Sequence, residues 1–160
     1  MEEEANDGMG SIMAICLELT TMASASETDP IINDFFISAY SSPMCMHIIR
    51  KNDVIRAKKV FGEYRADWTE EQFAEAEILC SGIQYATLMT ANDPVSFERR
   101  IYAALHGILA VFGLPKDVRN DNIQKVLAMN YQNLGKRILS EFREFVGQAN
   151  AQALQALLNQ

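Results

Sequence analysis

The sequence lacks the patterns on which many catalytic and metal sites depend. It has no Gly-rich phosphate-binding loop, no Gly-x-Ser-x-Gly segment and no Glu-x-x-His pair of the kind found in carboxylate-bridged di-iron bundles. Its two histidines, His47 and His106, have no Glu or His at the spacings of helical metal sites. We therefore expect no metal, no cofactor and no enzymatic activity. A cysteine nucleophile with a histidine distant in sequence would leave no such pattern and stays open.

The chain also lacks a concentrated basic patch. It carries 14 Lys and Arg against 21 Asp and Glu, a formal net charge of -7. The densest basic group is interrupted and typical of a solvated helix face: Arg50, Lys51, Arg56, Lys58 and Lys59. Because binding to phosphates requires clustered Lys and Arg, this pattern argues against nucleic-acid binding by this chain alone.

Close cysteine pairs and long apolar runs are absent as well. The three cysteines cannot all pair within one chain, and reduced thiols are the simplest interpretation: Cys16, Cys45 and Cys80. The first four residues, Met-Glu-Glu-Glu, are unlike the basic head of a signal peptide. The longest uncharged helical runs, residues 78–92 and 101–115, are too short to cross a bilayer. We expect a cytoplasmic protein without membrane contact.

What the chain does contain is a series of helix signals. Asp29-Pro30, Ser42-Pro43 and Asp93-Pro94 each place a good N-cap residue before a proline at the first helical position. Thr69 to Gln72 has the spacing of a capping box. No stretch shows sustained period-two alternation. The sequence therefore predicts an all-α protein.

These signals predict one domain, residues 1–146, followed by an Ala/Gln/Leu-rich tail, residues 147–160, that forms at most a marginal helix. We expect Trp68 to anchor the loop after residue 65 on the core. The predicted helices cover residues 10–25, 30–41, 43–52, 53–65, 70–90, 94–112 and 116–146.

The last two predicted helices form a hairpin around which the chain is organised. The segment Ile101–Phe112 is apolar almost all the way round, so it must be covered on every side. Gly113 and Pro115 then end the first arm. Two interpretations are equally good: an intermolecular four-helix bundle, or an intramolecular hairpin covered by the N-terminal helices. The first predicts a dimer interface of Ile101, Leu105, Ile108, Phe112, Leu127, Ala128, Tyr131, Gly135, Ile138 and Phe142.

A set of polar residues lies within apolar helical stretches. Buried polar groups are costly unless they are paired, so one explanation is a cavity whose polar groups await a ligand. The alternatives are that they pair with one another or with backbone, that they face solvent or, for Tyr102 and His106, that they contact a second copy. The predicted ligand-binding residues are Tyr40, His47, Glu77, Ser81, Gln84, Tyr85 and Tyr102.

Several segments, in this helix order, resemble the C-terminal ligand-binding and dimerisation domain of TetR/AcrR-type transcriptional regulators. The resemblance covers roughly residues 5–146 and is one of pattern. It is carried by Asp-Pro-Ile-Ile-Asn-Asp-Phe-Phe (29–36), Tyr-Ser-Ser-Pro (40–43), Trp-Thr-Glu-Glu (68–71), Ala-Glu-Ile-Leu (76–79), Gly-Ile-Gln-Tyr (82–85) and Phe-Gly-Leu-Pro (112–115).

The resemblance implies that the last two large helices form a dimeric four-helix bundle and that a small-molecule effector binds among the preceding helices. The family's DNA-binding helix-turn-helix module is missing here, so operator binding would belong to a longer parent protein. Residues 2–7 look like the end of the helix that would link the two modules. A ligand would tilt that helix and change the spacing of two DNA readers. The alternative is a helical protein-interaction or scaffold domain without a ligand.

Overall fold

The computed structural model describes residues 11–158, apart from the side chains of residues 142, 145, 146 and 153. This part of the chain is all-α, as predicted, and contains no strand. Its helices are α1 (Ser11–Thr28), α2 (Pro30–Ser41), α3 (Pro43–Phe61), α4 (Glu70–Met89), α5 (Phe97–Val111), α6 (Lys116–Leu127) and α7 (Tyr131–Leu158). The proposed linking segment, residues 2–7, lies outside the described residues.

The N-cap signals account for the starts of three helices. The Asp29 carboxylate accepts a hydrogen bond from the Ile31 amide (3.0 Å), and the Ser42 hydroxyl accepts one from the Cys45 amide (3.4 Å). At the start of α4, Thr69 and Gln72 form the predicted capping box. Each cap satisfies an amide that the first turn of a helix leaves without a partner.

Several predicted boundaries are wrong. The helix expected to end at residue 65 ends at Phe61, and the last helix continues to Leu158, through most of the segment expected to be a marginal tail. The helix after Asp93-Pro94 begins at Phe97, because the Asp93 carboxylate instead accepts a hydrogen bond from the Val95 amide (3.0 Å) in a turn. Helix α1 continues to Thr28, and α3 passes through residues 52–53 without a break. The predicted return arm is two helices, since the Asn130 side chain accepts a hydrogen bond from the Asn133 amide (3.3 Å) and begins a new helix.

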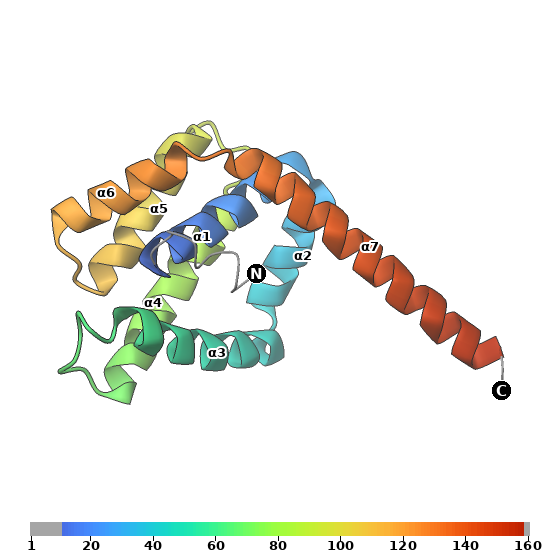
Figure 1. Ribbon diagram of the computed structural model, residues 1–160, viewed down its shortest axis with the longest axis horizontal. Coiled ribbons are helices and arrows are strands. Elements are labelled where there is room, and N and C mark those ends of the chain that lie inside the picture. The colour runs from blue at the N-terminus through green and yellow to red at the C-terminus, as the bar shows by residue number, and fades with distance from the viewer. Residues whose placement is uncertain (1–10, 159–160) are drawn as a thin grey trace.

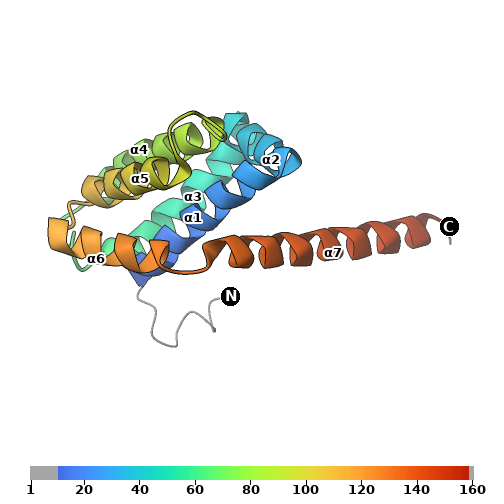
Figure 2. The same ribbon diagram turned by 90° about the horizontal axis from the view of Figure 1, so that it is seen from above.

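Helix α1 lies at the centre and contacts all six other helices (Figures 1 and 2). Helices α4, α5 and α6 follow one another along one side of it, and α2 and α3 lie on another. Helix α7 packs along α1 and then extends beyond the body of the molecule. Its 28 residues correspond to a length of about 40 Å.

The turn between α5 and α6 is held by the loop that follows α3. Gly113 has the predicted left-handed conformation, with a φ of 67°. The Arg65 guanidinium donates hydrogen bonds to the carbonyl oxygens of Phe112 (2.7 Å) and Gly113 (2.8 Å) and lies over the Trp68 ring. Trp68 contacts the Phe73 and Phe112 rings, which confirms that it anchors this loop on the core.

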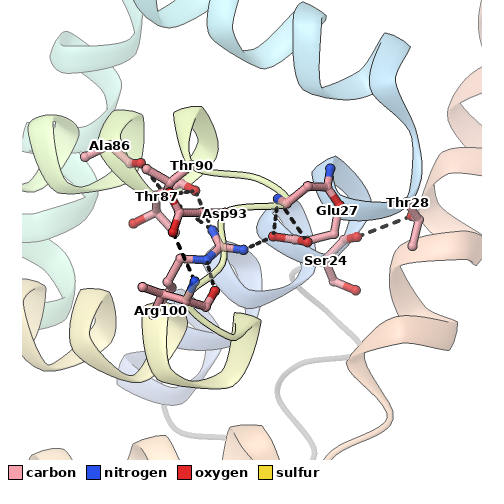
Figure 3. Close-up of polar contacts among 10 residues, drawn as sticks. Ser24, Glu27, Thr28, Ala86, Thr87, Thr90, Asp93 and Arg100 are labelled. Carbon is pink, nitrogen blue, oxygen red and sulfur yellow. Dashed lines mark hydrogen bonds and ion pairs between the residues drawn. The ribbon is translucent and has the colours of Figure 1, made fainter.

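A second polar network fixes the C-terminal end of α1 to the connection between α4 and α5 (Figure 3). Glu27 forms an ion pair with Arg100, whose side chain is only 10% exposed. The Glu27 carboxylate also accepts a hydrogen bond from the Asn92 amide (3.2 Å). Arg100 donates to the carbonyl oxygens of Thr87 (3.3 Å) and Val95 (3.1 Å). The guanidinium is therefore almost fully satisfied, as a poorly solvated charge must be.

Candidate functional site

A cavity of about 430 Å³ lies between α1, α2, α3, α4 and α5. This volume falls within the range of about 300–1,000 Å³ that is typical of small-molecule sites. Much of the wall is aromatic and aliphatic. Its large apolar side chains come from every one of these helices except α4, and from the residue that ends α5: Ile15, Leu19, Met22, Phe35, Phe36, Ile49, Phe61, Ile108 and Phe112.

The floor of the cavity is formed where the phenyl rings of Phe61 and Phe112 stack at 4.0 Å with an interplanar angle of 9°. Both residues are almost fully buried, and the Arg65 contacts described above hold the backbone of Phe112. This wall therefore belongs to the rigid core of the domain.

The polar wall comes from α1, α2, α3 and α4. The Tyr40 hydroxyl donates a hydrogen bond to Gln84 Oε1 (2.8 Å), which joins α2 to α4. Glu77 is only 4% exposed, and neither of its carboxylate oxygens accepts a hydrogen bond from another described residue. Its nearest positive charge is Arg50, whose Nε lies 3.5 Å from Oε2 and whose side chain is 46% exposed.

Burial and neighbouring carboxylates change the proton affinities in this wall. Burial, together with the negative charge of Asp53, raises the pKa of Glu77 from 4.5 to about 7, against the opposing effects of Arg50 and of the nearby Ser81 hydroxyl. The Ser81 hydroxyl donates to the Ile78 carbonyl in this structure, so it leaves the carboxylate without a donor. Burial and the Glu18 carboxylate raise the pKa of Asp53. Burial raises the pKa of the Cys80 thiol to about 12, with Glu77 and Asp53 adding to the shift. Cys80 is therefore a neutral thiol and a poor nucleophile.

Three of the predicted ligand-binding residues line this cavity: Tyr40, Glu77 and Gln84. The other four do not. His47 is exposed on α3, and Tyr102 is 43% exposed on α5, where its ring meets that of His106 edge-on. Ser81 is buried and donates to the Ile78 carbonyl (3.1 Å), and Tyr85 lies near Ser41 (hydroxyl oxygens 3.4 Å apart).

Four polar residues of the cavity wall were not predicted as site residues: Glu18, Asn52, Asp53 and Arg56. For Asp53, the spacing of its neighbours in the sequence gave a signal. Ile49, Asp53, Ala57 and Phe61 follow one another at intervals of four residues, so Asp53 shares a helical face with core residues. The predicted helix break at residues 52–53 hid this relation. Glu18 had no comparable signal, because it reads as an ordinary surface residue of α1.

The predicted dimer-interface residues lie mainly inside the chain's own fold. Ile101, Leu105, Ile108 and Phe112 are buried by the chain's own helices, as in the intramolecular interpretation. Tyr131 and Gly135 are also buried, and a Cβ at Gly135 would lie 3.5 Å from Thr21 of α1. The expectation that α5 is covered on every side is wrong, because Tyr102, Ala103 and Ala110 are exposed.

The remaining members of the predicted interface differ in exposure. Leu127 and Ile138 are half-buried, and Ala128 is exposed. The Phe142 side chain lies outside the described part. Among the described side chains of the predicted interface, only Ala128, the residue that ends α6, is therefore fully exposed to a partner.

Within residues 11–158, no three or more His, Cys, Asp or Glu side chains are arranged to hold a metal ion. The helices of the same range include none with the length and apolar character needed to span a bilayer. Comparison of the chain with protein-family models, with curated proteins and with solved structures gives no match.

Proposed function

We propose that this chain is the effector-sensing and dimerisation domain of a TetR-like transcriptional regulator in the cytoplasm. It binds a small molecule and thereby switches operator binding by a DNA-binding module upstream in a longer parent protein. The observation that carries this proposal is the cavity, which combines an aromatic wall with a buried carboxylate that accepts no hydrogen bond from another described residue. A net charge of -7 is consistent with sensing, and not DNA contact, as the task of this domain.

The position of α1 supports a switch. This helix lines the cavity with Ile15, Glu18, Leu19 and Met22 while contacting every other helix. A ligand that fits one position of α1 better than another would shift the population toward that position. Its N-terminal end is the point at which an upstream module would be attached.

A thermal-shift screen with hydrophobic and hydrogen-bonding small molecules tests ligand binding, because a ligand stabilises the form that it binds. Ala39→Phe would place a phenyl ring in the cavity and should abolish the shifts. Ser38→Phe adds the same ring at an exposed neighbouring position and is the matched control. Shifts that persist in Ala39→Phe would show that the compounds bind elsewhere.

Dimerisation belongs to the same proposal, with α7 as the contact. The end of α7 projects from the body and exposes Leu154 (60%), Leu157 (68%) and Leu158 (77%) (Figure 2). An isolated helical segment of this length is marginal in water, so pairing with a second copy would stabilise it.

Sedimentation equilibrium tests this contact. We expect a dimer that Leu154→Lys with Leu157→Lys converts to a monomer. Gln152→Lys with Gln155→Lys, at exposed positions of the same helix, adds the same charge and should stay dimeric. A wild-type monomer at micromolar concentration would contradict this part of the proposal.

A scaffold domain without a ligand is the second candidate. It is favoured by exposed apolar side chains along α3, namely Met44 (75%), Ile48 (56%) and Ile55 (63%). This candidate predicts that no small molecule shifts the melting temperature, so the screen described above separates the two.

A further inference from the structure

The polar wall of the cavity carries an excess of negative charge. Glu18, Asp53 and Glu77 contribute carboxylates. Two guanidiniums compensate them: Arg56 forms an ion pair with Glu18, and Arg50 lies 3.5 Å from Glu77. With all groups ionised, this cluster is left with one uncompensated negative charge.

The excess negative charge acts on groups inside the cavity. Burial raises the pKa of the Tyr40 hydroxyl, and the charges of Asp53, Glu18 and Glu77 all raise it further. All three carboxylates therefore act on the point where Tyr40 lines the cavity. A negative potential of this kind disfavours an anionic guest and favours a cationic one.

Glu77 supplies a specific contact point. Its carboxylate lines the cavity, is nearly inaccessible to bulk water and accepts no hydrogen bond from another described residue. A buried acceptor without a donor costs free energy. A positively charged donor would give the carboxylate a hydrogen bond and would also compensate the excess negative charge of the cluster.

The opposite wall suits the apolar part of such a guest. Phe36, Phe61 and Phe112 line the same cavity as Glu77. Aromatic faces attract cations as well as apolar groups. The cavity therefore offers a carboxylate for a charged nitrogen and an apolar surface for the body that carries it.

We propose that the effector is a hydrophobic organic cation: an aromatic or branched apolar body with one protonated nitrogen that donates to the Glu77 carboxylate. This inference rests on the proposed sensing function and specifies its ligand class. The two arginines do not provide an anion site, because each is already committed to a carboxylate of the cluster.

Three probes with one ring system and different charge test the proposal. The titrations are made at pH 8, above the pKa of about 7 that burial gives Glu77. At this pH 9-aminoacridine is a cation, acridine is neutral and acridine-9-carboxylate lacks a net positive charge. Isothermal titration calorimetry with the full chain should show 9-aminoacridine binding at least about tenfold more tightly than acridine, as expected for a charged hydrogen bond. The carboxylate should bind most weakly.

Glu77→Gln keeps the shape of the side chain and removes its charge. In this variant the preference for 9-aminoacridine over acridine should fall to about twofold or less, while acridine binding is retained. Glu75→Gln removes one charge from an exposed position of the same helix and should keep the preference. If Glu77→Gln does not fold, Asp53→Asn provides the test, because it removes one carboxylate from the same cluster.

The outcomes separate this inference from the function on which it rests. If acridine or its carboxylate binds as tightly as 9-aminoacridine, or if the preference survives Glu77→Gln, the cation proposal is overturned and the cavity still binds small molecules. If no probe binds and the screen with other compounds also gives no shift, both the cation proposal and the sensing function are contradicted.

Discussion

Removing the charge of Glu77 should change how the stability of the fold depends on pH. Burial and Asp53 raise the pKa of this carboxyl from 4.5 to about 7 in the folded state. Between about pH 4.5 and pH 7, the Glu77 carboxyl is therefore protonated in the folded state and ionised in the unfolded state. Its contribution to stability is complete below about pH 4.5 and is lost as the pH rises through about 7.

The magnitude follows from the size of the shift. At about 1.4 kcal/mol per pKa unit, a shift from 4.5 to about 7 corresponds to an upper limit of about 3 kcal/mol. Gln cannot ionise, so Glu77→Gln should be free of this loss. The difference in unfolding free energy, variant minus wild type, should increase by about 2 to 3 kcal/mol between about pH 5 and about pH 8.

Urea unfolding followed by the fluorescence of Trp68, the single tryptophan, measures this difference. The other titrating groups are present in both proteins, so they largely cancel in the comparison. Glu75→Gln controls for the loss of one negative charge from α4. If the difference in unfolding free energy between Glu77→Gln and wild type does not change with pH, the pKa of Glu77 is not raised by burial and the reasoning is refuted.

Three other variants and one labelling reaction test particular features of the fold. Arg100→Ala leaves the Glu27 carboxylate without its ion-pair partner and should lower the unfolding free energy by about 3 kcal/mol in urea titrations; a loss below about 1 kcal/mol would contradict the network in Figure 3. Gly113→Ala places a Cβ at a φ of 67° and against the Arg65 guanidinium, so a loss of about 1 to 3 kcal/mol in unfolding free energy is expected. Gly82→Ala should instead stabilise α4 by up to about 1 kcal/mol, because a Cβ at this position would have no neighbour outside its own helix backbone within 4 Å. Because burial raises the thiol pKa values of Cys16 and Cys80 to about 12, maleimide should label the half-buried Cys45 first, as measured by mass spectrometry; faster labelling of Cys80 would contradict its burial.

The parts of the fold that were predictable are those set by local chemistry. The starts at Pro30, Pro43 and Glu70 follow from a capping side chain and, at the first two, a proline. The stop at Gly113 follows from its left-handed conformation. The errors arose where a local signal had two possible outcomes: Asp93 caps a turn before Pro94 and not a helix, and Asn130 begins a new helix where the apolar spacing continues without interruption.

The candidate site was predictable only where polar groups interrupt apolar sequence. Glu77 and Gln84 stand out against their neighbours in α4 for this reason. His47 and Tyr102 have the same appearance in sequence, yet both lie on outward faces. The packing of the other helices decides which face of a helix is buried. A short stretch of sequence does not contain that information.

The same limit applies to α5. The sequence predicted cover on every side of this helix and was equally compatible with cover from a second copy or from the chain itself. The chain's own helices bury Ile101, Leu105 and Ile108, while Tyr102, Ala103 and Ala110 remain exposed. Composition specifies how much apolar surface must be hidden, but not by which molecule.

The two ends of α1 are restrained differently, and this bears on how a cavity could act on an upstream module. Near its C-terminal end, Glu27 is bound to Arg100 and Asn92, and α7 packs alongside. Toward its N-terminal end, Ile15 and Glu18 line the cavity, and the Glu18 carboxylate is paired with Arg56 of the same wall. A cation bound at Glu77 would add positive charge near the Glu18–Arg56 pair and weaken the repulsion among the three carboxylates. Because Glu27 fixes the C-terminal end, a rotation of α1 would displace its N-terminal end most, against the packing of Met13 and Cys16 in the core. Under the proposed sensing function, the start of α1 is therefore where a bound ligand would act on an upstream module.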